Sequence, residues 1–216
     1  MEKLVSHSCL SLQSNRLNFV NPKLDLQSLQ SLVAIKDGVL SVEECKEYIE
    51  LLDEYPSKVE EHDSKLYKFR QLNLHTTNEL PLIKKFANRV LEEADGYFTE
   101  RNLRQYIPEY GFEQVRIKHY PKNTDSQFRP HVDCYDTESS KRFLIAILYL
   151  NDNNGSTRFT NLGIECIPKM GRLILFPPFW AFPHSGEAPT DVDKFILMTS
   201  LNYLPSTGNY QNAIVS

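Results

Sequence analysis

The chain contains little cysteine and no excess of basic residues. Its 216 residues include 4 cysteines, which are scattered and form no CxxC pair. This spacing excludes a zinc knuckle and a secreted disulfide framework, so we expect a reducing, cytoplasmic location. With 24 Lys and Arg against 28 Asp and Glu, the formal net charge is -4. That balance provides no general attraction to phosphate backbones or anionic membranes, and nucleic acid is therefore a disfavoured partner.

Long hydrophobic runs, internal repeats and low-complexity tracts are also missing. The N-terminus is polar and rich in serine, and no apolar stretch reaches the length of a membrane span. The sequence thus predicts neither a signal peptide nor a transmembrane helix. No linker divides the chain, and its length suits one domain with a sizeable core. We expect a peripheral segment at 1–30, a single domain at 31–205 and a tail at 206–216.

Hydrophobic periodicity predicts helices first and strands afterwards. A strand and turn at 32–40 precede a helix at 41–55, which begins with an S-x-x-E capping box. After an acidic loop at 58–65 we expect a strand in YKFRQLNLH and a second helix at 80–98. From residue 112 onward the hydrophobic residues recur with a period of two, which is typical of strands. The strands expected there are 113–120, 128–134, 142–150, 156–160, 164–167, 172–176, 181–185 and 194–203.

This order of elements indicates an α+β protein that is mainly β. In the run RFLIAILYL at 142–150, apolar residues occupy both the odd and the even positions. Both faces of the strand are then apolar, as expected of a strand that is covered on both sides. We therefore expect an antiparallel double sheet over about 112–204, with the two helices packed on one outer face.

One polar pair stands out in the stretch FRPHVDCYD. His131 and Asp133 are two residues apart, and in a strand such residues point to the same face. By itself an H-x-D pair is more often a surface polar pair than a metal site. Downstream, however, His184 lies in another short apolar strand. Two histidines and one aspartate match the facial triad of non-haem Fe(II) oxygenases, which leaves three coordination positions open.

A second feature supports this interpretation of the triad. Lys194 follows His184 by ten residues and begins a long strand. If the open positions hold a chelating dicarboxylate such as 2-oxoglutarate, its distal carboxylate is buried and needs a cation. The alternative for Lys194 alone is an ordinary lysine at the rim of the sheet.

Several ordered blocks resemble the Fe(II)/2-oxoglutarate-dependent dioxygenases, in particular their prolyl 4-hydroxylase-like branch. The resemblance implies a double-stranded β-helix core, which is a jelly-roll or cupin-like fold, with the N-terminal helices on the major sheet. It also implies Fe(II), 2-oxoglutarate and O2, with ascorbate as a reductant. The chain has a single glycine, Gly155, where the family often has two. The blocks cover about 110–204 and read HYPKNTDSQFRPHVD, RFLIAILYLN, GSTRF, PKMGRLILF and HSGEAPTDVDK.

The resemblance also implies roles for individual residues. The implied metal ligands are His131, Asp133 and His184. The residues implied to face 2-oxoglutarate are Lys194 and Tyr149 at its distal carboxylate, then Tyr120 and Thr157. The candidate substrate contacts are Arg129, Tyr135 and Trp180. Packing between the two sheets is an equal alternative for Trp180.

The leading prediction for the reaction is hydroxylation of a prolyl or other amino-acid residue in a protein or peptide, with release of succinate and CO2. A free amino acid or another small molecule is the alternative substrate, and oxidative demethylation of nucleic acid is disfavoured by the acidic balance. A non-catalytic metal-binding jelly-roll protein would lack a triad member. A zinc-dependent cupin-like hydrolase or isomerase would not need Lys194 and Tyr149. The sequence leaves the oligomeric state open.

Overall fold

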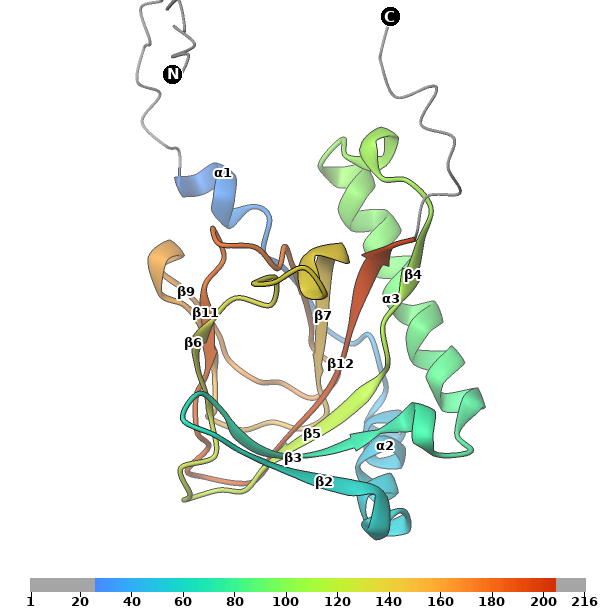
Figure 1. The fold of residues 1–216 in the computed structure, drawn as a ribbon, viewed down its shortest axis with the longest axis vertical. Helices are drawn as coiled ribbons and strands as arrows, with labels where there is room; N and C mark the ends of the chain where they lie inside the picture. The colour runs from blue at the N-terminus through green and yellow to red at the C-terminus, as the bar shows by residue number, and fades with distance from the viewer. Residues whose placement is uncertain (1–25, 205–216) are drawn as a thin grey trace, which may run out of the picture.

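The computed structural model describes residues 26–204, which form two β-sheets with helices on one of them (Figure 1). The predicted tail at 206–216 and most of the predicted peripheral segment at 1–30 lie outside the described residues. The end of that segment is a short helix, α1 (Leu26–Gln30). Within the described part of the chain, no helix is long and apolar enough to cross a membrane.

The larger sheet has eight antiparallel strands in the order β1-β10-β7-β12-β5-β3-β2, with β4 paired to β12. The central strands β7 and β12 are largely buried, as the apolar run at 142–150 predicts. Its strands are β1 (Ala34–Lys36), β2 (Val59–Asp63), β3 (Lys68–Asn73), β4 (Tyr110–Phe112), β5 (Arg116–Tyr120), β7 (Arg142–Tyr149), β10 (Leu173–Phe176) and β12 (Lys194–Tyr203).

The smaller sheet has four strands in the order β6-β11-β8-β9 and lies opposite the larger one (Figure 1). Its strands are β6 (Phe128–His131), β8 (Thr157–Phe159), β9 (Ile164–Cys166) and β11 (His184–Gly186). A cluster of buried apolar side chains, including Phe159, Phe176 and Phe182, fills the space between the sheets. The two sheets form the predicted jelly-roll core, because apolar faces of facing sheets must be buried against each other.

Two helices cover the outer face of the larger sheet (Figure 1), as predicted: α2 (Val42–Glu54) and α3 (Leu80–Glu100). The predicted capping box is present, because the Ser41 hydroxyl accepts the Glu44 N–H and the Glu44 carboxylate accepts the Ser41 N–H. Both helices bury one apolar stripe against the sheet. The 3-10 helices are Pro56–Lys58, Leu74–Thr76, Arg104–Tyr106, Ser139–Lys141 and Thr160–Leu162.

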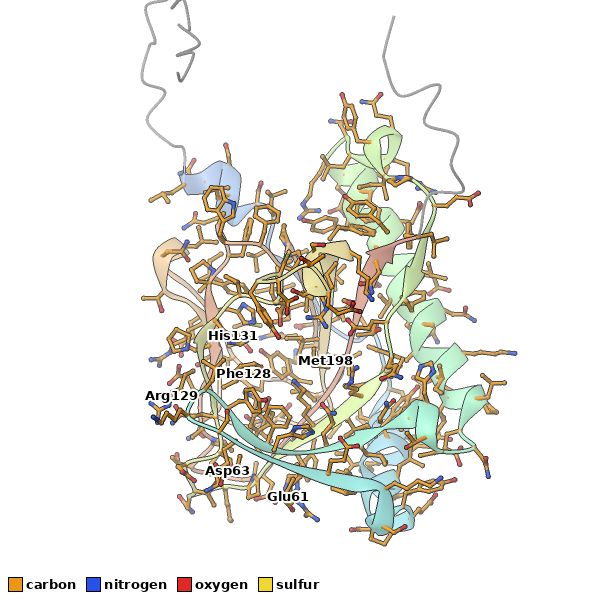
Figure 2. All side chains as sticks on the ribbon, viewed as in Figure 1. Glu61, Asp63, Phe128, Arg129, His131 and Met198 are labelled. Carbon is orange, nitrogen blue, oxygen red and sulfur yellow. The ribbon has the colours of Figure 1, made fainter. Side chains whose placement is uncertain are left out.

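The prediction of an acidic loop at 58–65 is wrong, because this segment contains β2. Glu61 and Asp63, which lie in the hairpin of β2 and β3 (Figure 2), face basic partners on the neighbouring strand. Glu61 pairs with Arg70 at 2.8 Å and Asp63 with Lys68 at 3.4 Å. Cross-strand ion pairs allow an acidic segment to join a sheet, and composition alone does not reveal them.

Some strand boundaries also differ from the predictions. The predicted strand at 113–120 begins later, at Arg116 in β5, and follows the short strand β4, which was not predicted. The predicted strand at 181–185 is centred later, in β11. The predicted strand at 128–134 ends at His131, so Asp133 lies in the following loop. The loop is anchored because the backbone N–H of Asp133 donates to the Pro178 carbonyl at 3.0 Å.

Candidate active site

His131, Asp133 and His184 converge between the two sheets. The pairing of β6 with β11 places His131 opposite His184, and Figure 2 shows His131 on β6 at the inner side of the smaller sheet. The Asp133 carboxylate lies 3.7 Å from Nε2 of His131 and 3.4 Å from Nε2 of His184. One ligand atom from each residue lies within 4.8 Å of the others. The arrangement is suited to one metal ion.

Backbone carbonyls orient both imidazoles. Nδ1 of His131 lies 2.8 Å from the Arg129 carbonyl, and Nδ1 of His184 lies 3.2 Å from the Phe182 carbonyl. Because a carbonyl only accepts hydrogen bonds, Nδ1 carries the proton in each ring and Nε2 keeps a free lone pair. Both free nitrogens face Asp133, which is the arrangement that a metal requires of its histidine ligands.

The carboxylate of Asp133 is charged and lacks a partner. Burial raises the pKa of Asp133, but His131, His184 and Lys118 more than offset this effect and hold that pKa at about 2. Its Oδ2 is the one side-chain oxygen or nitrogen in the described part of the chain that is fully shielded from solvent and has no hydrogen bond. Burial also lowers the pKa of His184 to about 4, which keeps the imidazole neutral. Two imidazoles with free Nε2 lone pairs and an unsatisfied carboxylate fit Fe(II).

A narrow pocket, here called the inner pocket, runs from the triad to Lys194. It is lined by Tyr120, Thr157 and Lys194 together with the triad residues. Lys194 is 1% exposed, and its Nζ has a single long hydrogen bond of 3.5 Å to the Glu187 carbonyl. Burial lowers the pKa of Lys194 to about 7. A buried ammonium without an anionic partner is energetically costly, and a carboxylate bound in the inner pocket would offset that cost.

Tyr149 is fully buried but does not line the inner pocket. Its hydroxyl donates instead to Oγ1 of Thr157 at 2.7 Å. Tyr149 thus orients the Thr157 hydroxyl, which does face the pocket. A direct bond from Tyr149 to 2-oxoglutarate stays a prediction.

A wider cavity of about 470 Å³, here called the mouth cavity, adjoins the triad. The mouth cavity and the inner pocket meet at Phe128, His131, Asp133 and Met198, and at Lys118. Figure 2 shows Phe128 and His131 on β6, across the interior from Met198 on β12. A molecule in the mouth cavity would therefore lie next to a metal held by the triad.

The structure brings only one of the three candidate substrate residues to this cavity. Tyr135 lines it and is 75% exposed. Trp180 is 82% exposed, and neither Trp180 nor Arg129 lines either space. Figure 2 shows Arg129 directed outward from β6.

A bulge explains the orientation of Arg129. Three steps along β6, from Phe128 to His131, pair with two steps along β11, from Gly186 to His184. Strict alternation along a strand would place Arg129 and His131 on the same face. The extra residue breaks this alternation, so the two side chains point to different faces. Phe128 and His131 both point inward instead, and their rings stack at a centroid distance of 3.4 Å.

Lys118 is a site residue that sequence reasoning missed. It lies on β5 and borders both spaces, and it is only 7% exposed. Burial lowers its pKa to about 8. A signal was available, because Tyr120 was expected to face the pocket and Lys118 is two residues earlier in the same strand.

Comparisons with known proteins agree with this geometry. Residues 115–201 match the family model of the 2OG-Fe(II) oxygenase superfamily. A search of curated proteins finds no significant match. The structure is similar to a viral collagen prolyl hydroxylase from Paramecium Bursaria Chlorella virus-1 in its 2OG complex. That match has a TM-score of 0.65 and 21% identity, and covers 80% of this chain and 97% of the other.

Two further solved structures have the same fold. A Pseudomonas putida prolyl-4-hydroxylase matches with a TM-score of 0.64 and 15% identity, over 83% of this chain and 97% of the other. A prolyl hydroxylase from Trichoplax adhaerens, in complex with a peptide fragment of the hypoxia inducible factor oxygen degradation domain, matches with a TM-score of 0.64 and 16% identity. That match covers 82% of this chain and 86% of the other.

The matched segment contains the whole triad, Lys194 and most strands of the core. Because the family model and the geometry of the triad agree, residues 115–201 form a domain similar to the 2OG-Fe(II) oxygenase superfamily, with a prolyl 4-hydroxylase-like fold and the residues of a dioxygenase that uses Fe(II), 2-oxoglutarate and O2.

Proposed function

We propose that the protein hydroxylates an unactivated C–H bond of a prolyl or other amino-acid residue in a protein or peptide, with release of succinate and CO2. In this proposal His131, Asp133 and His184 bind Fe(II), and Lys194 binds the distal carboxylate of 2-oxoglutarate. The observation that carries it is the pair of unsatisfied charges at the triad and along the inner pocket, the Asp133 carboxylate and the Lys194 ammonium. A divalent cation and a dicarboxylate satisfy both.

Fe(II) together with 2-oxoglutarate and O2 supplies the oxidation itself. The residues of the chain bind and orient the metal and the co-substrate and shield them from water. His131, Asp133 and His184 would hold the metal and would leave coordination positions for the co-substrate. Lys194 sets the direction of the co-substrate along the inner pocket, and the rings of Tyr120 and Phe128 line that pocket and exclude water.

A peptide substrate is supported by the structural neighbours, one of which holds a peptide fragment. It is also supported by the open mouth cavity beside the triad, where Tyr135 lies at the exposed rim. A free amino acid or another small molecule is the second candidate, because a cavity of about 470 Å³ lies in the range of small-ligand sites. We further propose a cytoplasmic location, from the scattered cysteines of the sequence.

The first experiment tests the cofactors. Protein reconstituted with Fe(II) under anaerobic conditions is mixed with 2-oxoglutarate, and the visible charge-transfer band of iron chelated by a 2-oxo acid is recorded. We expect a band in the wild type and none in Asp133→Ala. A wild-type protein that binds Fe(II) without developing this band would contradict the assignment of 2-oxoglutarate to the inner pocket.

The second experiment tests the substrate. Proline-containing peptides and free amino acids are screened for stimulation of succinate release in air, with and without ascorbate. Stimulation by a peptide, with a mass gain of one oxygen on it, supports the first candidate. Stimulation by free amino acids alone favours the second. Activity with Zn(II) in place of Fe(II) would contradict both, since zinc has no redox chemistry.

A further inference from the structure

Lys118 is a second buried cation beside the triad, and it lies apart from Lys194. On β5 it is opposite Gln71 of β3 and Ile196 of β12, whereas Lys194 is opposite Tyr120. Lys118 is therefore two residues further along the sheet than Lys194, a step of about 7 Å. It also borders the mouth cavity, which Lys194 does not.

The ammonium of Lys118 has no anionic partner. Within residues 26–204 its Nζ forms neither a hydrogen bond nor an ion pair, although the residue is only 7% exposed. Its surroundings are aromatic, since Nζ lies 4.3 Å from the ring centroid of Phe69 and 5.3 Å from that of Phe128. Cation–π contacts offset part of the cost of desolvation. They do not supply the anion that a buried charge needs.

The other cations of the mouth cavity are already compensated. Arg142 forms two bonds to the Glu113 carboxylate, at 2.7 and 2.8 Å, and Arg116 lies 3.7 Å from the same carboxylate. Asp133 belongs to the triad, where a metal satisfies it. Lys118 thus contributes one uncompensated positive charge to the wall of the mouth cavity. One uncompensated ammonium matches one negative charge, so a carboxylate fits better than a doubly charged phosphate.

We propose that Lys118 binds a carboxylate of the primary substrate in the mouth cavity, so that the enzyme prefers acidic over neutral substrates. The inference rests on the proposed function, because it takes the mouth cavity as the place where the substrate binds. The carboxylate belongs either to a free amino acid or to an acidic side chain in a peptide. In both cases an ammonium beside the triad fixes the distance of the reacting carbon from the metal.

Matched pairs of ligands test this proposal by binding rather than by turnover. The first panel contains N-acetyl amino acids, proline included, and their amides, which differ in the free carboxylate. The second contains N-acetyl-prolyl-glutamic acid amide and N-acetyl-prolyl-glutamine amide. Binding to the Fe(II) and 2-oxoglutarate protein without O2 is measured by calorimetry. We expect a charged member of one panel to bind about tenfold or more tightly than its neutral match.

The variant Lys118→Met identifies the residue responsible. It keeps the volume of the side chain and removes the buried charge, so it is expected to fold. The preference for the charged ligand should disappear, while the 2-oxoglutarate concentration that gives half of the charge-transfer band stays unchanged. The matched control is Lys84→Met, since Lys84 is an exposed lysine on α3 and its loss should leave the preference intact.

Two results would overturn the proposal. One is equal binding, or no binding, of charged and neutral members in both panels. The other is a raised 2-oxoglutarate requirement in Lys118→Met, which would assign Lys118 to the co-substrate. The charge-transfer band of the same samples reports separately on the proposed function, because a protein can develop the band and still show no preference for carboxylates.

Discussion

Asp133 and Lys194 each bring an uncompensated charge into the space between the sheets. The carboxylate has an oxygen without a hydrogen bond, and the ammonium has only a long contact with a carbonyl. The ammonium is unfavourable in the protein alone, and both charges gain a partner when a metal and a dicarboxylate bind. Removing either residue should therefore weaken ligand binding more than it weakens the fold.

Asp133→Ala tests the carboxylate. We expect loss of Fe(II) binding and of succinate release, because the triad loses its only anionic ligand. The metal-free variant should be less stable than metal-free wild type by about 1 to 3 kcal/mol, since the interactions that hold the pKa of this carboxyl at about 2 are lost. Chemical denaturation and metal titration measure the two effects. Turnover at the wild-type rate would remove Asp133 from the ligand set.

Lys194→Ala tests the ammonium. The 2-oxoglutarate requirement should rise, with a loss of about 2 to 5 kcal/mol from the missing charge partner. Initial rates of succinate release at varied 2-oxoglutarate measure it, and Lys84→Ala is the exposed control. An unchanged requirement would point to Arg158 or Arg172 instead. Those cations are already paired, with Glu165 at 2.9 Å and Asp37 at 2.6 Å.

At the scale of elements, the segment before β8 approaches Glu187, just after β11, and Lys194 of β12 closely, and this approach depends on one glycine. A Cβ on Gly155, just before β8, would lie 2.8 Å from the Glu187 carbonyl oxygen and 3.1 Å from Cδ of Lys194. The first contact is with backbone and cannot be relieved by a side-chain rotation. The absence of a side chain at Gly155 therefore leaves room for the Lys194 stem.

Gly155→Ala should consequently disturb both stability and the co-substrate site. We expect a loss of about 1 to 3 kcal/mol in the free energy of unfolding and a raised 2-oxoglutarate requirement. The control is Gly96→Ala in α3, where nothing lies within 4 Å of the added Cβ. That variant should be up to about 1 kcal/mol more stable, because alanine favours a helix. Equal effects of the two substitutions would show that the close approach at Gly155 is unimportant.

For the whole molecule, the two buried lysines make stability depend on pH. The native pKa is about 7 for Lys194 and about 8 for Lys118, and burial lowers both. In the unfolded chain a lysine has a pKa of about 10.4. Between these values the unfolded state binds more protons than the native state, so the free energy of unfolding rises with pH.

We expect metal-free protein to gain about 2 kcal/mol in the free energy of unfolding between about pH 7 and about pH 8.5. Above this window burial of the Cys45 thiol, whose pKa is raised to about 11, acts in the opposite direction. Denaturant titrations at several pH values test the wild type against Lys194→Met, which should show a smaller slope. Parallel slopes in the two proteins would contradict a buried charge at Lys194.

How much of this could be predicted from the sequence depends on the range of the interactions. The helices, most strands and the capping box at Ser41 follow from local periodicity, which neighbouring residues determine. The strand at Val59–Asp63 was missed because its charges are compensated by a partner strand. The bulge at Arg129 was missed because it depends on pairing between β6 and β11.

The sequence by itself determined the jelly-roll fold, the similarity of residues 115–201 to the 2OG-Fe(II) oxygenase superfamily and the set of residues that could form a metal site. Ordered motifs suffice for these, because their spacing along the chain carries the information. Only the tertiary structure decided that the Asp133 oxygen is unpaired, that Trp180 and Arg129 lie away from the cavities, and that Lys118 borders them. Burial and pairing are relations between distant segments, and they exist only once the two sheets have packed.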